Sequence, residues 1–311
     1  MKREFPKGTY PMPDVTFESL VCKPLTTHTG AEIEFPVKQT VATNLSAETS
    51  AELIRALGKY KVVFLRNLDY DYDQLLAFSR QFGELMELPY IRPVDGYPEI
   101  IAVLKEADEV NMGVFGGDWH SDFSFLASPP SYSVLHSKEV PEFGGDTVWV
   151  NMAAAFAALD DSTKDSLRSR YAVHTGAPYG VTNAPPEETQ FKGSIQMDRD
   201  NPEADLETFH PAVCVHPETG EEVLFISPTY TVRFGDRDQA ASQAELKALY
   251  AHCTRPEFNC RFRWEPGVIA IWDNRSTMHY AVNDYDGHRR LLHRTAIRGS
   301  PPVGTARLQE T

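Results

Sequence analysis

Cysteine is scarce in this sequence of 311 residues, which has only Cys22, Cys214, Cys253 and Cys260 and no CxxC spacing. Zinc-finger sites and disulfide frameworks need cysteines in pairs or clusters. We therefore predict four ordinary reduced thiols that take no part in a metal site.

Long apolar runs and an excess of basic residues are also missing. No stretch approaches the ~18–20 apolar residues of a membrane span, and residues 1–15 lack the apolar segment of a signal peptide. The formal net charge is −14, from 44 acidic and 30 basic residues. A nucleic-acid or anionic-membrane surface would need a basic face. We expect a cytoplasmic protein that acts on a small molecule, with no nucleic-acid or membrane partner.

The apolar pattern predicts helices first and mostly short strands afterwards. Helical spacing covers residues 46–60, 71–85, 153–171 and 242–253. Short apolar runs between turn residues indicate strands at 61–68 and 99–107, two antiparallel strands at 131–140 and 147–152, a hairpin over 212–227 turning at Thr219-Gly220, and two strands within 260–282 separated by Glu265-Pro266-Gly267. This order favours one mostly β domain over 1–311, an antiparallel sandwich or jelly roll with helices packed outside it. The stretch 176–208, rich in proline, glycine and acidic residues, is expected to be a lid or insert.

The segment "GGDWHSDFSF", residues 116–125, carries the first candidate metal ligands. On an extended strand His120 and Asp122 would point to the same side and form half a metal site. The alternative is a loop in which Asp122 caps a turn. His279, after the strand-like "VIAIW" and an Asn-Arg turn, is the candidate third ligand. Two histidines and one carboxylate leave three positions open on iron(II), which suits a chelating co-substrate and dioxygen.

Arginines follow His279 closely in the sequence. Arg290 and Arg294 could pair with a dicarboxylate that chelates the metal, because the planar guanidinium matches carboxylate geometry. Arg289, by contrast, is expected at the surface or behind the site.

These segments together resemble the iron(II)- and 2-oxoglutarate-dependent dioxygenases of the taurine dioxygenase type. The matching segments, in order, are "GAEIEF", "KVVFLRN", "FGEL", "DWHSDFSF", "GGDTVWVNMAAAFAAL", "HPETGEEVLFIS", "RWEPGVIAIWDNRSTMHYAVNDY" and "RRLLHRTAIRG". The resemblance implies a double-stranded β-helix (jelly roll) core, with Fe(II), 2-oxoglutarate and O2 as cofactor and co-substrates. It makes His120, Asp122 and His279 the iron ligands.

The resemblance also assigns the co-substrate residues. Thr147 would hydrogen-bond a carboxylate of 2-oxoglutarate, and Arg290 would form its main salt bridge. Arg294 would reach either 2-oxoglutarate or an anionic group of the prime substrate. Members of the family are often dimers or tetramers, so a homo-oligomer is possible.

The reaction implied is oxidation of a C–H bond, most simply hydroxylation, while 2-oxoglutarate is decarboxylated to succinate and CO2. Halogenating relatives have a small residue where this chain has Asp122, so no halide chemistry is expected. Desaturation and C–S or C–O cleavage by the same iron chemistry remain open. Two competing classes also remain: a β-sandwich that binds a small acid without turnover, and a zinc hydrolase.

Departures from the taurine enzyme argue against taurine as the prime substrate. After "FGEL", where that enzyme has a histidine for the sulfonate, this chain has Met86 and Leu88, which cannot donate a hydrogen bond to an anion. Gly116-Gly117 stands where that enzyme has an asparagine. A larger or more apolar substrate is expected, with Phe115, Phe123, Phe125 and Tyr90 as candidate wall residues.

Several other residues near these motifs are expected to be structural. His174, His210 and His216 should be satisfied by hydrogen bonds or exposed, and His293 should face away from Arg294 on a strand. Asn274 and Arg275 are expected to orient the turn before His279. Trp119 and Trp272 are expected to pack near the metal.

Overall fold

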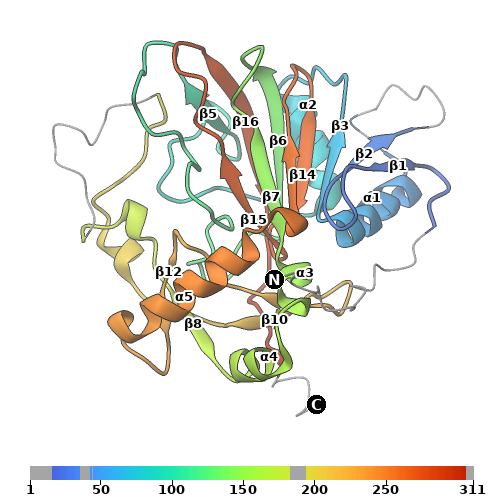
Figure 1. Cartoon of the computed structure of the whole chain (residues 1–311). Helices are drawn as coiled ribbons and strands as arrows, with labels where there is room; N and C mark the ends of the chain where they lie inside the picture. The colour runs from blue at the N-terminus through green and yellow to red at the C-terminus, as the bar shows by residue number, and fades with distance from the viewer. Residues whose placement is uncertain (1–15, 36–42, 44, 183–193, 306–311) are drawn as a thin grey trace.

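The computed structural model describes residues 16–35, 43, 45–182 and 194–305. These residues form β-sheets with helices packed outside them (Figure 1). The helices are α1 (Ala47–Tyr60), α2 (Tyr72–Ser79), α3 (Met152–Ala157), α4 (Asp161–Arg168) and α5 (Gln239–Cys253). In this part of the chain no helix is long and apolar enough to cross a bilayer. All four cysteines are free, as predicted.

The largest sheet has eight strands in the order β1-β2-β3-β14-β6-β16-β4, with β5 paired to β16. Its strands are β1 (Val21–Pro24), β2 (Ala31–Glu34), β3 (Val62–Leu65), β4 (Leu85–Met86), β5 (Ile101–Lys105), β6 (Tyr132–Glu139), β14 (Ile269–Asp273) and β16 (Arg290–Ile297). Neighbours are antiparallel except β2 and β3. The two strands of this sheet that carry site residues, β6 and β16, therefore have neighbours on both sides.

The two faces of this sheet belong to two different cores. Val63 and Leu65 of β3 face the cluster that contains Leu53 and Leu57 of α1. The alternate residues of the same strand, including Phe64, join a second cluster with Trp149. Because both faces are buried, the strand sequences are continuous apolar runs and not an alternation of apolar and polar residues.

A three-stranded sheet, β13-β7-β15, covers the second face. Its strands are β13 (Asn259–Phe262), β7 (Thr147–Asn151) and β15 (Thr277–Ala281). Phe64 of the large sheet stacks on Phe262 of β13 at a centroid distance of 3.8 Å. The space between these two sheets is where Thr147 and His279 meet Arg290 of β16.

Strand partners are where the predictions from sequence were wrong. The predicted antiparallel strands 131–140 and 147–152 exist as β6 and β7, but they lie in different sheets. The segment 260–282, predicted as two strands, contains three, and its Glu265-Pro266-Gly267 turn leads from β13 in the small sheet to β14 in the large one. An apolar pattern identifies a strand, whereas the choice of partner depends on how both faces are buried.

Two smaller sheets complete the described strands. β12 (Thr231–Phe234), β8 (Tyr171–His174) and β9 (Thr208–Pro211) form one, and β10 (Val213–Val215) with β11 (Glu222–Leu224) forms the other. The second confirms the predicted hairpin, with Gly220 at φ +71° in its turn. Helices α3, α4 and α5 lie at this end of the molecule, away from α1 and α2 (Figure 1).

Helix starts follow the sequence signals, but one predicted helix is two. Ser46 caps α1 by accepting from the Thr49 N–H, and Asp71 with Gln74 forms a capping box on α2. The predicted helix over 153–171 is broken into α3 and α4, because Asp160 accepts from the Thr163 N–H and starts a new helix. Asp160 thus competes with continued helix through a local side-chain hydrogen bond.

The predicted lid over 176–208 is partly described, and residues 183–193 lie outside the described residues. On one side, η2 (Ala177–Tyr179) buries Tyr179 fully. On the other, Met197 forms a bridge with Ile91, and the Asp198 N–H donates to the Tyr90 carbonyl. Both described flanks therefore pack against the segment around Tyr90, close to the site.

Candidate active site

Backbone pairing joins the two histidines of the candidate site. The His120 N–H donates to the His279 carbonyl at 3.1 Å, and the His279 N–H donates back at 2.8 Å. This is an isolated bridge, and Asp122 lies in a turn. The extended strand considered for residues 120–122 is therefore wrong, but the turn still directs both side chains to the same place. Phe123, at φ +47°, is the residue that bends the chain there.

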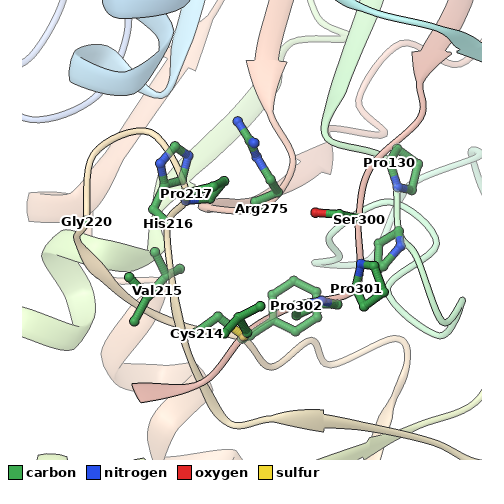
Figure 2. Close-up of a pocket in the computed structure, with 14 residues that line it drawn as sticks. Pro130, Cys214, Val215, His216, Pro217, Gly220, Arg275, Ser300, Pro301 and Pro302 are labelled. Carbon is green, nitrogen blue, oxygen red and sulfur yellow. The ribbon is translucent and has the colours of Figure 1, made fainter. Parts of the chain in front are cut away.

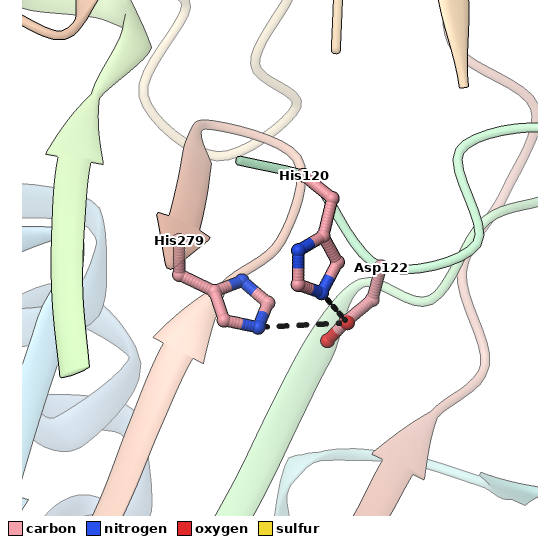
Figure 3. Close-up of side chains that lie close together, drawn as sticks. All are labelled: His120, Asp122 and His279. Atoms are coloured by element: carbon pink, nitrogen blue, oxygen red, sulfur yellow. Dashed lines mark ion pairs between the residues drawn. The ribbon is translucent and has the colours of Figure 1, made fainter. Parts of the chain in front are cut away.

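His120, Asp122 and His279 converge in the buried interior (Figure 3). Asp122 Oδ1 lies 3.4 Å from His120 Nε2 and 3.7 Å from His279 Nε2. One potential ligand atom from each residue lies within 4.8 Å of the others. The structure thus brings together the three residues that the sequence analysis selected from both halves of the chain.

The pKa shifts of His279 and Asp122 suit metal binding. His120 Nδ1 lies 2.7 Å from the Asp118 carbonyl, which directs Nε2 toward Asp122. Burial, followed by the charge of His120, lowers the pKa of His279 well below its usual value. Burial alone would raise the pKa of Asp122, but Arg294 and His279 outweigh it and hold it far below its usual range. A neutral His279 and an ionised Asp122 are suitable ligands for a divalent transition metal.

Neighbouring groups fix the orientation of Asp122. Ser133 Oγ of β6 donates to Asp122 Oδ2 at 2.7 Å, and Arg294 Nη2 lies 2.6 Å from the same oxygen. Oδ1 is thereby turned toward the imidazoles. Asn274 holds the backbone of Asp122 on both sides: its Oδ1 accepts from the Asp122 N–H at 2.6 Å and its Nδ2 donates to the Asp122 carbonyl at 2.9 Å. Asn274 therefore orients the turn that contains Asp122, whereas we predicted that it orients the turn before His279.

Arg290 and Thr147 form a second polar group deeper between the sheets. The Arg290 guanidinium is 4 % exposed and, among the described residues, no carboxylate lies within ion-pair distance. It donates to the Gly145 carbonyl at 3.1 Å and reaches Thr147 Oγ1 at 3.5 Å. Trp264 Nε1 also donates to Thr147 Oγ1 at 2.9 Å. The hydroxyl proton of Thr147 is left to donate to a further acceptor, and a buried cation without a counter-ion calls for an anion.

Arg294 lies between the two groups. Its Nη2 forms an ion pair with Asp122 Oδ2 at 2.6 Å, but neither Nη2 nor the buried Nε has a hydrogen-bond partner among the described residues. One small cavity is lined by His120, His279, Thr147, Arg290 and Arg294, with Phe115 and Trp272 among its apolar walls. All the predicted cofactor residues thus line the same space or contact Asp122 beside it.

The candidate wall residues have unequal positions. Phe115 lines the cavity. Phe123 and Phe125 are buried in an aromatic cluster with Tyr179 and Tyr230, and half-buried Tyr90 stacks on Tyr179 at 5.4 Å. The Phe123 ring also lies 5.9 Å from the Arg294 guanidinium carbon.

Some contributors had no signal in the sequence. Ser133, Tyr179 and Tyr230 were not predicted, and Trp264 and Tyr285 lay in a matching segment without an assigned role. Ser133 is one polar residue in an apolar strand, and only the pairing of β6 beside β14 and β16 shows that it faces Asp122. Tyr285 hydrogen-bonds Arg290 from the loop before β16.

The other histidines are structural, as expected. His174 is fully buried, 3.0 Å from Ser124 Oγ, and His210 Nε2 lies 3.0 Å from the Leu126 carbonyl. His216 pairs with Asp273 at 2.8 Å. His293 packs on Tyr72, while its neighbour Arg294 faces the site.

A buried cluster of two histidines and a carboxylate, beside a pocket whose Arg290 has no carboxylate partner among the described residues, is the arrangement expected of a metal-dependent enzyme that takes an anionic co-substrate. Comparison with known proteins makes the class specific. The family described as "Taurine catabolism dioxygenase TauD, TfdA family" matches residues 22–296. The chain belongs to this family.

Individual relatives agree with this assignment. An alpha-ketoglutarate-dependent sulfate ester dioxygenase of Pseudomonas putida is 34 % identical over 283 residues, 90 % of each chain. An alkylsulfatase of Acinetobacter baylyi is 32 % identical, over 92 % of this chain and 87 % of the relative. A solved taurine dioxygenase from Burkholderia xenovorans is similar with a TM-score of 0.76 and 34 % identity, over 93 % of this chain and 92 % of that one.

The protein is thus a 2-oxoglutarate-dependent dioxygenase, which uses Fe(II), 2-oxoglutarate and O2. This finding decides against the binding module without turnover and against the zinc hydrolase.

Proposed function

We propose that this dioxygenase hydroxylates a C–H bond of a small organic substrate, with His120, Asp122 and His279 as its metal ligands. The observation that carries the proposal is their convergence beside a pocket that contains a buried arginine without a carboxylate partner among the described residues. When bound, Fe(II) and 2-oxoglutarate supply the oxidising chemistry, in which one oxygen atom of O2 enters succinate and the other enters the substrate.

Arg290 and Thr147 bind the far carboxylate of 2-oxoglutarate in this proposal. The guanidinium supplies the charge, and the Thr147 hydroxyl donates because its oxygen already accepts from Trp264. Arg294 keeps one nitrogen on Asp122 and offers its Nε to an anionic group of the co-substrate or prime substrate. The aromatic cluster around Phe123 and Tyr179 excludes water from the reacting atoms.

We also infer that the strands form a double-stranded β-helix. Four connections, β6 to β7, β13 to β14, β14 to β15 and β15 to β16, cross from one facing sheet to the other. Such crossing is expected of a jelly roll and differs from a simple meander.

The favoured substrate is an alkyl sulfate ester, with cleavage of the C–O bond as the outcome. Two relatives are named a sulfate ester dioxygenase and an alkylsulfatase. Met86 and Leu88, at the positions that argue against taurine, belong to the apolar cluster that includes Phe123. Hydroxylation of the carbon that bears the ester oxygen gives a hemiacetal sulfate, which breaks down to an aldehyde and inorganic sulfate.

A coupled-product assay tests this proposal. We expect an alkyl sulfate such as hexyl sulfate to give succinate, hexanal and inorganic sulfate in equal amounts. Taurine should give little succinate above the rate without substrate. If alkyl sulfates gave no succinate, and taurine, an alkanesulfonate, an aryloxy acid or a natural-product scaffold gave succinate in their place, the substrate assignment would be contradicted.

Substitution of Arg290 tests the co-substrate site. Arg290→Ala should raise the 2-oxoglutarate concentration required for half-maximal rate by about 100-fold or more, because losing the partner of a buried charge costs ~3–5 kcal/mol. Arg289→Ala is the matched control, since Arg289 pairs with Glu106 and Glu139 at the surface. An unchanged requirement in Arg290→Ala would move the anchoring role to Arg294.

A further inference from the structure

A second cavity of about 300 Å³ lies apart from the pocket that contains the histidines (Figure 2). Its lining is largely apolar, with prolines prominent. The residues are Pro129, Pro130, Cys214, Val215, His216, Pro217, Gly220, Val223, Phe225, Arg275, Ser300, Pro301, Pro302 and Val303. A largely apolar pocket that is roomier than the ~150 Å³ cavity that binds benzene in an engineered protein can hold a small organic molecule.

Three walls of this cavity are continuations of segments that carry site residues. Pro129 and Pro130 lie shortly after Asp122 in the chain. Arg275 lies between β14 and β15, the strand of His279. Residues 300–303 follow the end of β16, which carries Arg290 and Arg294.

Asn274 connects two of these walls to the site directly. Its Nδ2 donates to the Pro130 carbonyl at 3.0 Å as well as to the Asp122 carbonyl. Its chain neighbour Arg275 lines the cavity. A displacement of either wall therefore acts on the side chain that clamps the backbone of Asp122.

The third wall is tied to the first by short backbone contacts. The Ser131 N–H donates to the Ile297 carbonyl at 2.9 Å, and Ser131 Oγ donates to the Arg298 carbonyl at 3.1 Å. At Gly299 even a Cβ would come within 2.0 Å of the Pro129 carbonyl oxygen. These segments thus respond to a change in the cavity as one unit.

Charge indicates which kind of molecule fits. The Arg275 guanidinium is already paired with Asp273, which its Nη2 reaches at 2.6 Å, and with Glu218 at 2.9 Å. His216 Nε2 hydrogen-bonds Asp273, and its Nδ1 accepts from the Thr219 N–H. The polar groups at this wall are therefore satisfied within the protein, and the remaining surface suits an uncharged apolar ligand.

We propose that this cavity is a second binding site, which takes a small uncharged apolar molecule and tightens metal binding at the Asp122 site when filled. A ligand in contact with all three walls restricts their motion. The metal then binds at a lower cost in conformational entropy. The coupling rests on the metal centre proposed above, whereas the binding of the molecule does not.

Titration with 1-fluoronaphthalene, followed by fluorine NMR on the metal-free full chain, tests the binding. We expect saturable binding to wild type and at least a tenfold loss in Val215→Trp and in Val303→Trp, which fill the cavity from two sides. Val21→Trp, on the exposed β1, is the control and should bind as wild type does. No saturable binding to wild type, or equal binding by both filled variants, would overturn the site.

Mn(II) affinity, measured by electron paramagnetic resonance with and without saturating 1-fluoronaphthalene, tests the coupling. We expect Mn(II) to bind at least threefold tighter with the probe, and the probe to bind tighter by the same factor with Mn(II), as linkage requires. Unchanged or weaker Mn(II) binding would overturn the coupling. Absence of any Mn(II) binding would overturn the proposed metal centre and the coupling with it, while probe binding would still support the cavity.

Discussion

Two clusters of histidine and carboxylate side chains in this protein differ in what their atoms are free to do. His120, Asp122 and His279 form one, and His216, Glu218 and Asp273 form the other. In both, one possible ligand atom from each residue lies within 4.8 Å of the others. Residue type and proximity alone would therefore select either as a metal site.

Hydrogen bonding separates the two. Asp273 Oδ1 accepts from the backbone and side chain of Arg275, and its Oδ2 accepts from Arg275 and His216. Both ring nitrogens of His216 are also engaged. Around Asp122, donors hold Oδ2 and leave Oδ1 facing the imidazoles. The difference shows that a metal centre needs ligand atoms that the protein orients but does not itself satisfy.

The largest expected effect comes from removing a ligand of the first cluster. His279→Ala and Asp122→Ala should each abolish succinate formation that depends on substrate and weaken Mn(II) binding by more than 100-fold. Loss of a residue that merely supports a ligand already costs roughly 10–100-fold. Calorimetric Mn(II) titration and a succinate assay measure the two quantities.

The matched substitution in the second cluster is His216→Gln. It should leave Mn(II) affinity within about twofold of wild type, because the possible ligand atoms of His216 and Asp273 already have hydrogen-bond partners. If His216→Gln lost Mn(II) binding while His279→Ala kept it, the two clusters would have to exchange roles.

The second-largest effect is a loss of stability, which we expect when the partners of Asp273 in the second cluster are removed. Burial raises the pKa of Asp273, but Arg275 and His216 outweigh this and hold it far below its usual value. Arg275→Ala should lower the free energy of unfolding by about 3–5 kcal/mol, since it leaves a buried carboxylate with one partner fewer. Glu218→Gln, which changes a half-exposed partner of the same arginine, should cost less than about 1 kcal/mol. Equal losses in urea unfolding would show that the buried pair is not what stabilises this cluster.

The same contrast explains how far the sequence could predict the site. His120, Asp122, His279, Thr147, Arg290 and Arg294 were all selected from motifs, and the structure brings them together. The family of the protein is confirmed, while the individual roles of these residues stay predictions. Ser133 and the donor network that fixes Oδ2 could not be predicted, because they depend on which strand lies beside which.

Strand pairing limited the prediction of the fold for the same reason. Most strands, the Ser46 cap and the hairpin at Gly220 follow from local patterns. β6 pairs with β14 and β16, and β7 pairs with β13 and β15. These pairings depend on how the two apolar faces of each strand are buried. A run that is apolar throughout, such as β3, carries no period that says which face belongs to which core. Sequence patterns therefore located many of the strands, missed β1, β2, β8, β9 and β12, and did not assign the sheets.

The smallest expected effect extends the comparison to a buried histidine that has no carboxylate beside it. Burial lowers the pKa of His174 to about 3, and its hydrogen-bond partners are the hydroxyls of Ser124 and Thr231. Below pH ~6.5 the unfolded state binds a proton that the folded state refuses, so stability falls as the pH drops from ~6.5 toward 3, by up to about 1.4 kcal/mol per pH unit. His174→Gln should flatten that slope in urea unfolding between pH 6.5 and 4.5. His293→Gln should also flatten it, but over a range that ends near pH 4, because the pKa of His293 is lowered only to about 4. A slope unchanged in both variants would mean that the acid sensitivity lies with the carboxylates and that buried neutral imidazoles contribute little to it.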